Sequence, residues 1–427
     1  MGTLLIILST ILTFNFWILS KTDITSIQAF PLQSASQIAA LIGTLLLSWN
    51  FILATRLPVL EDLFGGQDKV YKKHHILGIF SFVLLLHHPI LLAFRYLNNT
   101  TLALRYFLPS NLLSYNLGIF ALWGMIILLI LTLFIKLPYQ SWLFTHRLLG
   151  LPLLIASVHM FLIPSDISQS GLLRYWMFAW VGVGIVSYLY KVYLYRFLGP
   201  RNECRVLSVT LHGDIVDIVL KPVDKKMSYL PGQFVFLSTN SKGIGGESHP
   251  FSISSYGSGE TIRLGIKALG DYTHRLQLLK AGDTAFVYGP YGRFSRRYLD
   301  STKDALWIAG GIGITPFLSL FDYEKTLPSK HRTVHFIYSC VESRENTTFD
   351  AEIQGALPAV PHVHYAHFCS TKQGYLTAAK IKAQVGEVKD KLILICGPEV
   401  MRVSLTEQFV TMGVPRSNII FEDFNLL

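Results

Sequence analysis

Hydrophobic positions are distributed unevenly along the 427-residue chain. Six apolar stretches in its first half are each long enough to cross a bilayer as a helix. They lie near residues 3–20, 36–55, 74–94, 114–135, 142–163 and 174–193. The first stretch has neither a basic segment before it nor a clear small-residue cleavage site after it, so we expect a helix there and not a signal peptide. The pattern predicts an integral membrane domain in the first half of the chain.

The second half has two different patterns. Up to Gly292, short alternating runs such as 205–211 and 215–220, separated by Gly213, predict an antiparallel sheet. From Ala305 onwards, apolar strands alternate with helices, which predicts a parallel, doubly wound sheet. We therefore expect a multidomain membrane protein with a six-helix transmembrane bundle over residues 1–198, an antiparallel β-barrel over 199–298 and an α/β doubly wound domain over 299–427.

Basic residues outside the apolar stretches predict the orientation. Lys69, Lys72 and Lys73 lie between the second and third stretches, and Lys191 and Arg196 lie at the end of the sixth. Because basic loops stay in the cytoplasm, we expect both termini there and the chain in the plasma membrane. The formal net charge of +10 fits residues that face an anionic inner leaflet. Without a basic stripe interleaved with aromatic residues, that charge gives no sign of nucleic-acid binding.

Four histidines lie in two of the apolar stretches. His74 and His88 are in the third, and His146 and His159 are in the fifth. His74 and His146 open similar phrases, His-His-Ile-Leu-Gly and His-Arg-Leu-Leu-Gly, which favours His74 over His75. A histidine at membrane depth is costly without a partner, so two matched pairs predict a functional site. Hydrogen bonding inside the bundle is the alternative for any one of them.

The spacing of the pairs suits two haem irons. Separations of 14 and 13 residues correspond to about 21 Å and about 20 Å along a helix. Fourteen steps return to within about 40° of the same face, whereas thirteen end about 140° away. The fifth helix therefore needs a local change of phase, which Pro152 permits. Since both helices run outward, pairing by depth predicts an inner haem held by His74 and His146 and an outer haem held by His88 and His159.

Such haems would serve electron transfer. Two histidines fill both axial positions of an iron, so the haem would pass electrons and not bind a substrate directly. His87 is the main alternative to His88 as the outer ligand. The four cysteines lie in the soluble half without CxxC spacing, which argues against a disulfide framework, a zinc site and an iron–sulfur cluster. There is no CxxCH motif, so we expect haem b, bound non-covalently.

Two phrases of the predicted barrel could bind polar ligand groups. In His-Pro-Phe-Ser-Ile-Ser-Ser, residues 249–255, alternate serines share one face of a strand and could bond a polar ring edge or a ribityl chain. Lys267 precedes Gly270 and Thr273 at the start of a short helix, where free backbone N–H groups suit a pyrophosphate. A surface strand and an ordinary helix cap are the alternatives.

The α/β domain opens with a dinucleotide-binding pattern. Strand 305–309 runs into Gly-Gly-Ile-Gly-Ile-Thr-Pro-Phe, residues 310–317, and then into a helix. Glycines in such a turn let the backbone approach the phosphates of a dinucleotide. Two later strands, 333–339 and 391–396, should end on the same edge of the sheet.

The ends of these strands suggest how a nicotinamide dinucleotide would bind. Ser339 and Arg344 suit an adenosine 2′-phosphate, although Glu342 between them would repel it. We expect NADPH or NADH, with a small preference for NADPH. Cys396 would lie near the nicotinamide. Phe424, three residues from the end of the chain, is explained by core packing when it is considered alone.

These motifs, in this order, resemble a known superfamily. The His-Pro-Phe-Ser phrase, the Gly-x-x-Thr at 270–273, the Gly-Gly-x-Gly-x-Thr-Pro turn and the late Cys-Gly-Pro make the soluble half similar to ferredoxin–NADP reductases. Joined to six helices with paired histidines on the third and fifth, the whole chain resembles the prokaryotic NADPH oxidases of the ferric reductase transmembrane superfamily.

The resemblance implies roles for individual residues. The residues implied to hold FAD are His249, Pro250, Phe251, Ser252, Lys267, Gly270, Thr273 and Phe424. The residues implied to hold NAD(P)H are Gly310, Gly311, Gly313, Thr315, Pro316, Ser339, Arg344, Cys396, Gly397 and Pro398. Of these, Cys396 beside the nicotinamide and Phe424 stacked on the flavin would be catalytic. Phe424 would have to move before nicotinamide could stack on the flavin.

The implied function is transmembrane electron transfer from cytoplasmic NAD(P)H through FAD and two b-type haems to an external acceptor. We expect O2 as that acceptor, giving superoxide, and no obligatory protein partner. A ferric or other metal reductase acting on a ferric chelate, a cytochrome that serves a protein partner, and an anchor or transporter without haem are the alternatives. The acceptor is the open point. The eukaryotic oxidases carry a further histidine where this chain has Leu92, and an arginine near the outer end of the second helix, where this chain offers Gln37 and no arginine.

Overall fold

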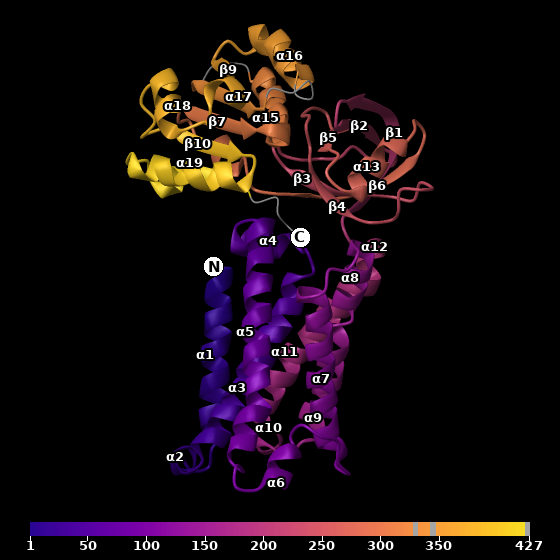
Figure 1. The fold of residues 1–427 in the computed structure, drawn as a ribbon, viewed down its shortest axis with the longest axis vertical. Helices are drawn as coiled ribbons and strands as arrows, with labels where there is room; N and C mark the ends of the chain where they lie inside the picture. Colours follow the sequence, from indigo (N-terminus) through magenta and orange to yellow (C-terminus); the bar gives the residue numbers. More distant parts are fainter. Residues whose placement is uncertain (328–331, 342–346, 423–427) are drawn as a thin grey trace. The chain divides into compact units, whose positions relative to one another are not determined.

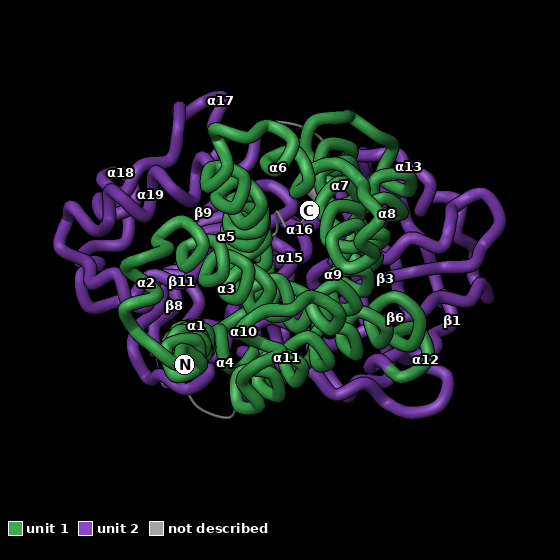
Figure 2. The backbone as a smooth tube through the Cα atoms, turned by 90° about the horizontal axis from the view of Figure 1, so that it is seen from below, with its two compact units in different colours: residues 1–198 green, residues 199–427 purple. Residues whose placement is uncertain are grey.

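The chain forms two compact units, residues 1–198 and 199–427, which are coloured separately in Figure 2. The computed structural model describes residues 1–327, 332–341 and 347–422. Unit 1 is helical and unit 2 contains two sheets.

Six helical spans make up unit 1, and each is long and apolar enough to cross a membrane. The predicted six-helix membrane domain is therefore confirmed. Four spans contain one helix each: α1 (Gly2–Leu19), α3 (Pro31–Leu53), α5 (Gln67–Phe94) and α7 (Leu113–Leu133). The fifth consists of α8 (Tyr139–Arg147) and α9 (Gly150–Leu162), and the sixth of α11 (Gly171–Leu189), η1 (Tyr190–Leu194) and α12 (Tyr195–Leu198).

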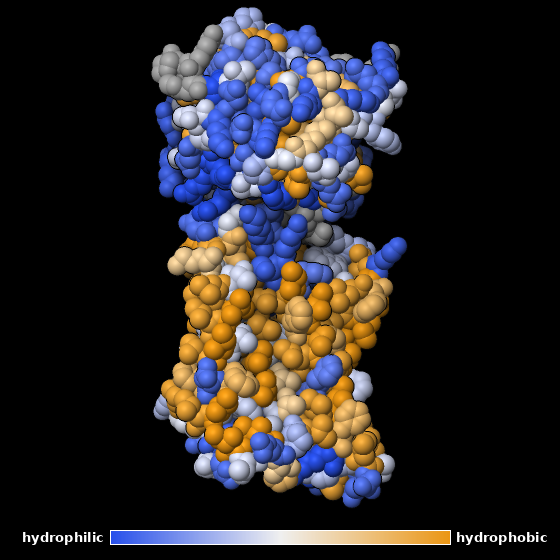
Figure 3. Space-filling model, turned by 90° about the vertical axis from the view of Figure 1, so that its left-hand side faces the viewer, coloured by the Kyte–Doolittle hydropathy of each residue, from blue (hydrophilic) through white to orange (hydrophobic). Residues whose placement is uncertain are grey.

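Short helices connect the spans. At one end of the bundle lie α2 (Thr25–Ala29), α6 (Thr100–Leu104) and α10 (Asp166–Gln169), and at the other lies α4 (Pro58–Phe64) (Figure 1). On the face that Figure 3 shows, hydrophobic side chains cover the spans, with hydrophilic residues at the end that carries α2 and α6. Hydrophobic side chains of the spans are exposed in the structure, among them Phe80 at 58% and Phe120 at 51%. Such a surface is stable against lipid but not against water.

The fifth span is interrupted between its two histidines. At Leu148 and Leu149 the helix tightens, and the N–H of Leu149 and of Leu151 donate to the carbonyls three residues earlier, at 3.2 and 2.9 Å. Pro152 explains the interruption, because it has no N–H for the Leu148 carbonyl and its ring would clash there in a continuous helix. Since α9 begins at Gly150, the proline occupies a first turn, where its missing N–H is not needed. The fifth span is thus interrupted between its two histidines, just before the proline, where the sequence predicts a change of phase.

The first sheet of unit 2 is antiparallel and curled. Its strands are β1 (Arg201–His212), β2 (Ile215–Pro222), β3 (Phe234–Thr239), β4 (His249–Ser252), β5 (Ile262–Lys267) and β6 (Thr284–Tyr291), in the order β4-β3-β6-β1-β2-β5. Gly213, with a φ of 60°, turns β1 into β2 as predicted. The edges approach each other where the N–H of Ser254 donates to the Arg263 carbonyl at 2.8 Å. Three helical segments follow the strands: α13 (Asp271–Arg275), η2 (Leu276–Leu278) and α14 (Arg296–Leu299).

The second sheet is parallel throughout. Its strands are β7 (Ala305–Gly310), β8 (Val334–Cys340), β9 (Val363–Cys369), β10 (Leu392–Cys396) and β11 (Ile419–Phe421), in the order β11-β10-β7-β8-β9. The first strand is central and the order reverses beside it, so β7 and β10 flank the switch point where such sheets bind ligands. Every residue of β7 is buried, as a sheet covered on both faces requires.

Helices cover both faces of this sheet, and a separate apolar core lies on each face. They are α15 (Thr315–Thr326), α16 (Thr347–Ala356), α17 (Ser370–Gln373), α18 (Ala378–Val385) and α19 (Glu399–Thr411). Among the described residues of this domain, short 3₁₀ turns also occur at η3 (Gly311–Ile314), η5 (Leu357–Ala359) and η6 (Arg416–Asn418). The predicted fold class, a helical bundle followed by an antiparallel and a doubly wound domain, is confirmed.

Candidate functional site

Two of the predicted haem ligands face each other inside unit 1. The ring centroids of His74 on α5 and His146 on α8 are 6.1 Å apart, with the ring planes at 63°. Nδ1 of His74 lies 3.0 Å from the backbone oxygen of Asn50 on α3, and Trp142 stacks on His146 with centroids 5.2 Å apart. Two metal–nitrogen bonds of about 2 Å each, with the rings beyond them, would fill a gap of this size.

The second pair is held in a similar way. Nδ1 of His88 lies 2.8 Å from Ser36 Oγ and 3.1 Å from the Ser36 carbonyl on α3. Nδ1 of His159 lies 2.6 Å from the Ser114 carbonyl on α7, and the His159 ring is close enough to His88 for an electrostatic interaction. A methyl group at Gly118 would come within 2.9 Å of the His159 ring, so α7 can approach this closely only with glycine there.

Nδ1 contacts orient three of the four imidazoles. A neutral imidazole that donates from Nδ1 to an oxygen leaves the lone pair of Nε2 available to a metal. His146 differs, because its Nδ1 is buried and has no hydrogen-bond partner among the residues that the structure describes. The four side chains therefore fit metal-bound imidazoles, three of them with a fixed tautomer.

The alternative ligands lie elsewhere. His75 and His87 are both exposed on the surface of the bundle. Nδ1 of His87 lies 2.7 Å from the Val83 carbonyl of its own helix. This geometry favours His74 and His88 over their neighbours, as the repeated phrase predicts for His74.

A polar cluster that sequence reasoning missed lies beside Ser36. Lys21 Nζ is 2.6 Å from Asp166 Oδ2 and donates to Gln37 Oε1 at 2.8 Å. Trp17 donates to the same carboxylate at 3.0 Å. A lysine paired with a carboxylate thus lies at this end of the bundle. No spacing rule connects these residues, because they come from three separate segments.

Stacking joins the two phrases predicted to bind FAD. The rings of His249 and Tyr272 stack with centroids 4.2 Å apart, and His249 Nε2 lies 2.9 Å from Glu247 Oε2. Tyr272 lies between Gly270 and Thr273, so this contact fixes the start of α13 against β4. Pro250 and Phe251 pair with β3, and Ser252 ends β4. Ser248 Oγ is buried without a hydrogen-bond partner among the described residues, which fits a ligand at this position.

The side chains predicted at the pyrophosphate are engaged locally. Thr273 Oγ1 accepts hydrogen bonds from the N–H groups of Leu269 and Gly270, at 3.0 and 2.9 Å. Lys267 Nζ lies 3.1 Å from Asp214 Oδ2. At Gly270 an added methyl would meet nothing within 4 Å, so the backbone is open on that side. The arrangement offers backbone and a nearby lysine, whereas the threonine hydroxyl caps the helix.

Serine hydroxyls beyond β4 close the sheet. Ser254 Oγ donates to the Arg263 carbonyl at 3.0 Å, and Ser255 Oγ accepts from the Arg263 N–H at 3.1 Å. These two hydroxyls are therefore used within the protein, although the alternation of serines suggested a ligand-facing row. Alternation identifies a face but not the strand that lies opposite.

The glycine turn after β7 packs on the turn after β10. A methyl at Gly313 would lie 2.4 Å from the Cys396 carbonyl, and one at Gly397 would lie 3.0 Å from Gly310. A methyl at Gly310 would meet Pro398 at 3.0 Å. The structure therefore brings both predicted nicotinamide dinucleotide motifs together at the switch point.

The helix that follows the glycine turn, α15, begins at the same edge of the sheet. Gly311 has a φ of 53°, and a methyl there would meet nothing within 4 Å. Thr315 donates to the Ile312 carbonyl at 3.0 Å, and Pro316 lies in the first turn of α15. The amino end of α15 is thus held at the same edge as the glycines, where its dipole favours an anion.

The remaining predicted residues differ in how the structure places them. Ser339 is paired in register with Gly310, so it lies at the ligand edge. Cys396 is only 1% exposed, and burial raises the pKa of its thiol above the ordinary range, with a further contribution from Glu422. Arg344 and Phe424 lie outside the described residues.

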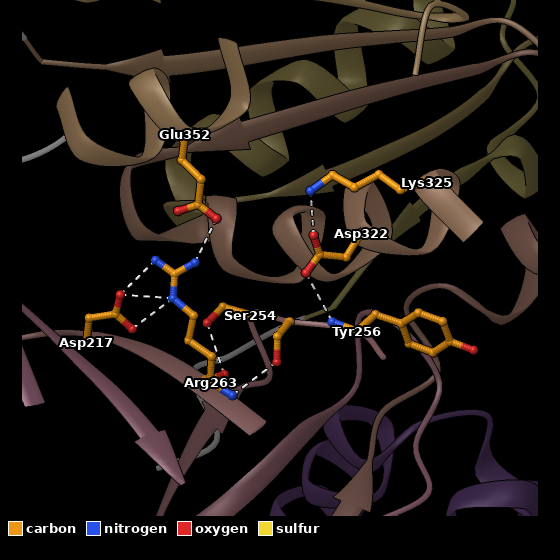
Figure 4. Close-up of polar contacts among 8 residues, drawn as sticks. Asp217, Ser254, Tyr256, Arg263, Asp322, Lys325 and Glu352 are labelled. Carbon is orange, nitrogen blue, oxygen red and sulfur yellow. Dashed lines mark hydrogen bonds and ion pairs between the residues drawn. The ribbon is translucent and has the colours of Figure 1, made fainter. Parts of the chain in front are cut away.

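Arg263 of β5 connects the two sheets of unit 2, which sequence reasoning did not foresee. It binds both oxygens of Asp217 on β2, at 2.7–3.0 Å, and Glu352 on α16 at 2.7 Å (Figure 4). Nearby, the N–H of Tyr256 donates to Asp322 Oδ2 on α15 at 3.2 Å. These contacts join the segment after β4 to the helix that follows the glycine turn.

Comparison with known families covers most of the chain in three blocks. Residues 39–158 match the ferric reductase like transmembrane component, 202–295 an FAD-binding domain and 307–406 an oxidoreductase NAD-binding domain. The chain has the ferric reductase and NADPH oxidase domain architecture. Each block falls on the part of the structure with the corresponding fold.

Individual relatives share parts of this ferric reductase-type chain. Flavohemoprotein A of Dictyostelium discoideum is 27% identical over 261 residues, which are 56% of this chain and 64% of that protein. Ferric reduction oxidase 8 of Arabidopsis thaliana is 35% identical over 150 residues, 32% of this chain and 20% of its own length. A flavohemoglobin structure from Malassezia yamatoensis aligns with 93% of this chain and 97% of its own, at 17% identity and a TM-score of 0.50, a likeness of fold alone.

Proposed function

We propose that the protein is a transmembrane electron-transfer enzyme that takes electrons from NADPH or NADH on the cytoplasmic side and delivers them to O2 outside, giving superoxide. FAD and two haem b would be its resident cofactors. When bound, the flavin supplies the change from hydride to single-electron chemistry, and the haems supply iron that cycles between two oxidation states. The orientation with both termini in the cytoplasm of a plasma-membrane protein belongs to the same proposal.

The observation that carries the proposal is the arrangement of four imidazoles on two spans. His74 faces His146, three of the four rings are oriented through Nδ1, and the alternative histidines are exposed. A costly set of polar groups inside an apolar bundle is explained when each ring binds a metal through Nε2. We assign His74 and His146 to the inner haem, and His88 and His159 to the outer one.

The soluble unit would supply the electrons. We assign residues 249–252, together with Lys267, Gly270 and Thr273, to the FAD site. The glycine turn with Thr315 and Pro316, together with Ser339 and Cys396 to Pro398, is assigned to NAD(P)H. Arg344 and Phe424 keep their predicted roles at the 2′-phosphate and at the flavin. These residues bind and orient the cofactors, and the buried Cys396 would line the nicotinamide site as a neutral thiol.

A ferric chelate reductase is the second candidate, favoured by the match of residues 39–158 to the ferric reductase like transmembrane component. The test that separates the two uses purified protein with NADPH. Reduction of cytochrome c that superoxide dismutase suppresses supports the oxidase, whereas turnover that requires an Fe(III) chelate and ignores O2 supports the reductase. Protein without a dithionite-sensitive haem spectrum would refute the electron-transfer proposal itself.

A further inference from the structure

A buried ammonium group without a hydrogen-bond partner lies in the sixth span. Lys191 belongs to η1, a π-helical turn of a kind often found at functional positions. Its Nζ is buried and forms no hydrogen bond with the residues that the structure describes. The ring of Tyr195 lies 3.9 Å away. The attraction of an aromatic face for a cation is smaller than the cost of burying an unpaired charge, so an anion is expected here.

Two arginines add positive charge to the same place. Arg56 and Arg147 both lie close enough to Lys191 to interact with it electrostatically. The guanidinium of Arg56 is 6.0 Å from the same Tyr195 ring, and its Nε donates to Tyr71 Oη at 2.7 Å. Two positive charges near the buried Nζ of Lys191 disfavour its charged form, and an anion beside Nζ would offset this effect.

The backbone of Arg56 is also unusual. Its φ of 61° is left-handed, which is a strained conformation for a residue with a side chain. It is the one non-glycine residue with positive φ in the described part of the chain. Backbone of this kind persists where the surroundings hold it, commonly at ligand sites.

The three cations lie beside the inner histidine pair. Arg147 directly follows His146. A methyl at Gly150 would come within 2.2 Å of the Tyr188 ring, so α11 packs closely against the start of α9. Lys191 is three residues beyond Tyr188 and therefore lies on a neighbouring part of the same helix face. Arg147 thus lies next to His146, and the contact of Tyr188 with Gly150 brings the segment of Lys191 to the same part of the fifth span.

We propose that Lys191, Arg56 and Arg147 form an anion site that binds a propionate carboxylate of the haem between His74 and His146. This inference rests on the proposed haem ligation. A phosphate of an anionic lipid in the inner leaflet has the same chemistry and is the alternative source of the anion. The two sources can be told apart, because the carboxylate is present whenever the haem is bound, whereas the phosphate is present only when anionic lipid is.

The test is a potentiometric titration of the purified full chain, followed by the haem absorbance in detergent without added lipid. Lys191→Met should lower the midpoint potential of one of the two haems or remove that haem, because a nearby cation favours the less positively charged ferrous state. Lys191→Arg should preserve the wild-type titration. Arg196→Met is the matched control, since it removes an exposed arginine from the same segment and should change neither haem.

The outcomes distinguish this inference from the proposed function. Wild-type protein without haem overturns both. Wild-type protein with two haems that titrate identically in Lys191→Met overturns the anion site alone. An effect that occurs only in nanodiscs containing phosphatidylglycerol, and not in phosphatidylcholine or detergent, assigns the site to lipid and overturns the carboxylate. Should Lys191→Met not fold, Arg147→Met at an exposed position carries the same expectation.

Discussion

At the scale of single residues, the candidate membrane site depends on close approach as much as on ligands. His159 is enclosed between the Ser114 carbonyl and Gly118 of α7. The ring cannot retreat from an added methyl group without lengthening its 2.6 Å contact to that carbonyl. The absence of a side chain at Gly118 is therefore what allows His159 to occupy its place.

Gly118→Ala should lower the haem content of the purified protein by displacing His159, with a cost to stability of about 1–3 kcal/mol. Gly124→Ala on the same helix is the control, because its methyl would meet Pro152 at an ordinary 3.7 Å. That variant should gain up to about 1 kcal/mol of helix propensity. The reduced-minus-oxidised haem absorbance per protein and the melting temperature measure both effects. Equal haem content in the two variants would contradict the proposed outer ligand.

Buried thiols make the stability of unit 2 depend on pH. Burial raises the pKa of Cys204 to about 12 and that of Cys340 to about 11, and the pKa of Cys396 is raised as well. Below the ordinary value of 9.0 both folded and unfolded chains hold neutral thiols, so the contribution to stability is complete. Above it only the unfolded chain ionises, and stability is lost as the pH rises.

The free energy of unfolding should therefore fall above about pH 9, by up to about 1.4 kcal/mol per pH unit for each such thiol. Thermal melts of the full chain between about pH 8 and pH 10.5 test this. Cys396→Ala should show a weaker dependence than the wild type. In the same pH range iodoacetamide should modify the partly exposed Cys369 before Cys396, and the opposite order would show that Cys396 is accessible.

At the scale of elements, the interruption of the fifth span sets the relation between its histidines. A continuous helix would place His146 and His159 about 140° apart. The tightened turn at Leu148 and Leu149 changes this phase, and Pro152 is the reason that the turn is stable.

Pro152→Ala should restore a continuous helix and remove one haem while leaving the bundle about as stable. Because Pro152 lies in the first turn of α9, its removal should change the free energy of unfolding little, so the haem content should respond while the stability does not. Circular dichroism and haem absorbance measure the two. Pro31→Ala is the control, since Pro31 also lies in a first turn but at the beginning of α3, where it separates no histidine pair. A variant that keeps both haems would show that Pro152 is not needed for the phase.

The elements themselves could be predicted from the sequence to very different degrees. The six spans are confirmed because lipid imposes length and composition on every one of them. The π-helical turn η1 was not foreseen, since its residues are ordinary for a helix and the turn depends on packing. The closing role of Ser254 and Ser255 was also missed, because it depends on which strand lies opposite.

At the scale of the whole molecule, the sequence predicted the sites that have local signatures. The glycine turn and the Cys-Gly-Pro turn meet as expected, since both follow strands of one parallel sheet. Contacts between distant segments, such as Arg263 with Asp217 and Glu352, have no such signature. They join the antiparallel sheet to the helices of the parallel one, so they control how the two candidate nucleotide sites of unit 2 are placed.

Arg263→Met should destabilise unit 2 by about 3–5 kcal/mol, because it leaves the Asp217 carboxylate buried without its partner. Asp217 is only 7% exposed. Glu352→Gln removes a pair whose carboxylate side chain is 39% exposed, and it should cost less than about 1 kcal/mol. Denaturant unfolding of the full chain, followed by protein fluorescence, compares the two. Similar losses in both variants would show that the energy of the cluster is not concentrated at Asp217.

Asn50 and Ser114 contact the candidate ligands through backbone carbonyls. A carbonyl is retained whatever side chain stands at the position, provided that the helix keeps its place. In a saturation mutagenesis screen for electron transfer, positions 50 and 114 should therefore tolerate more replacements than His74 and His159, although their backbone carbonyls contact these two candidate ligands. Such a screen would identify the ligands and overlook the groups that orient them.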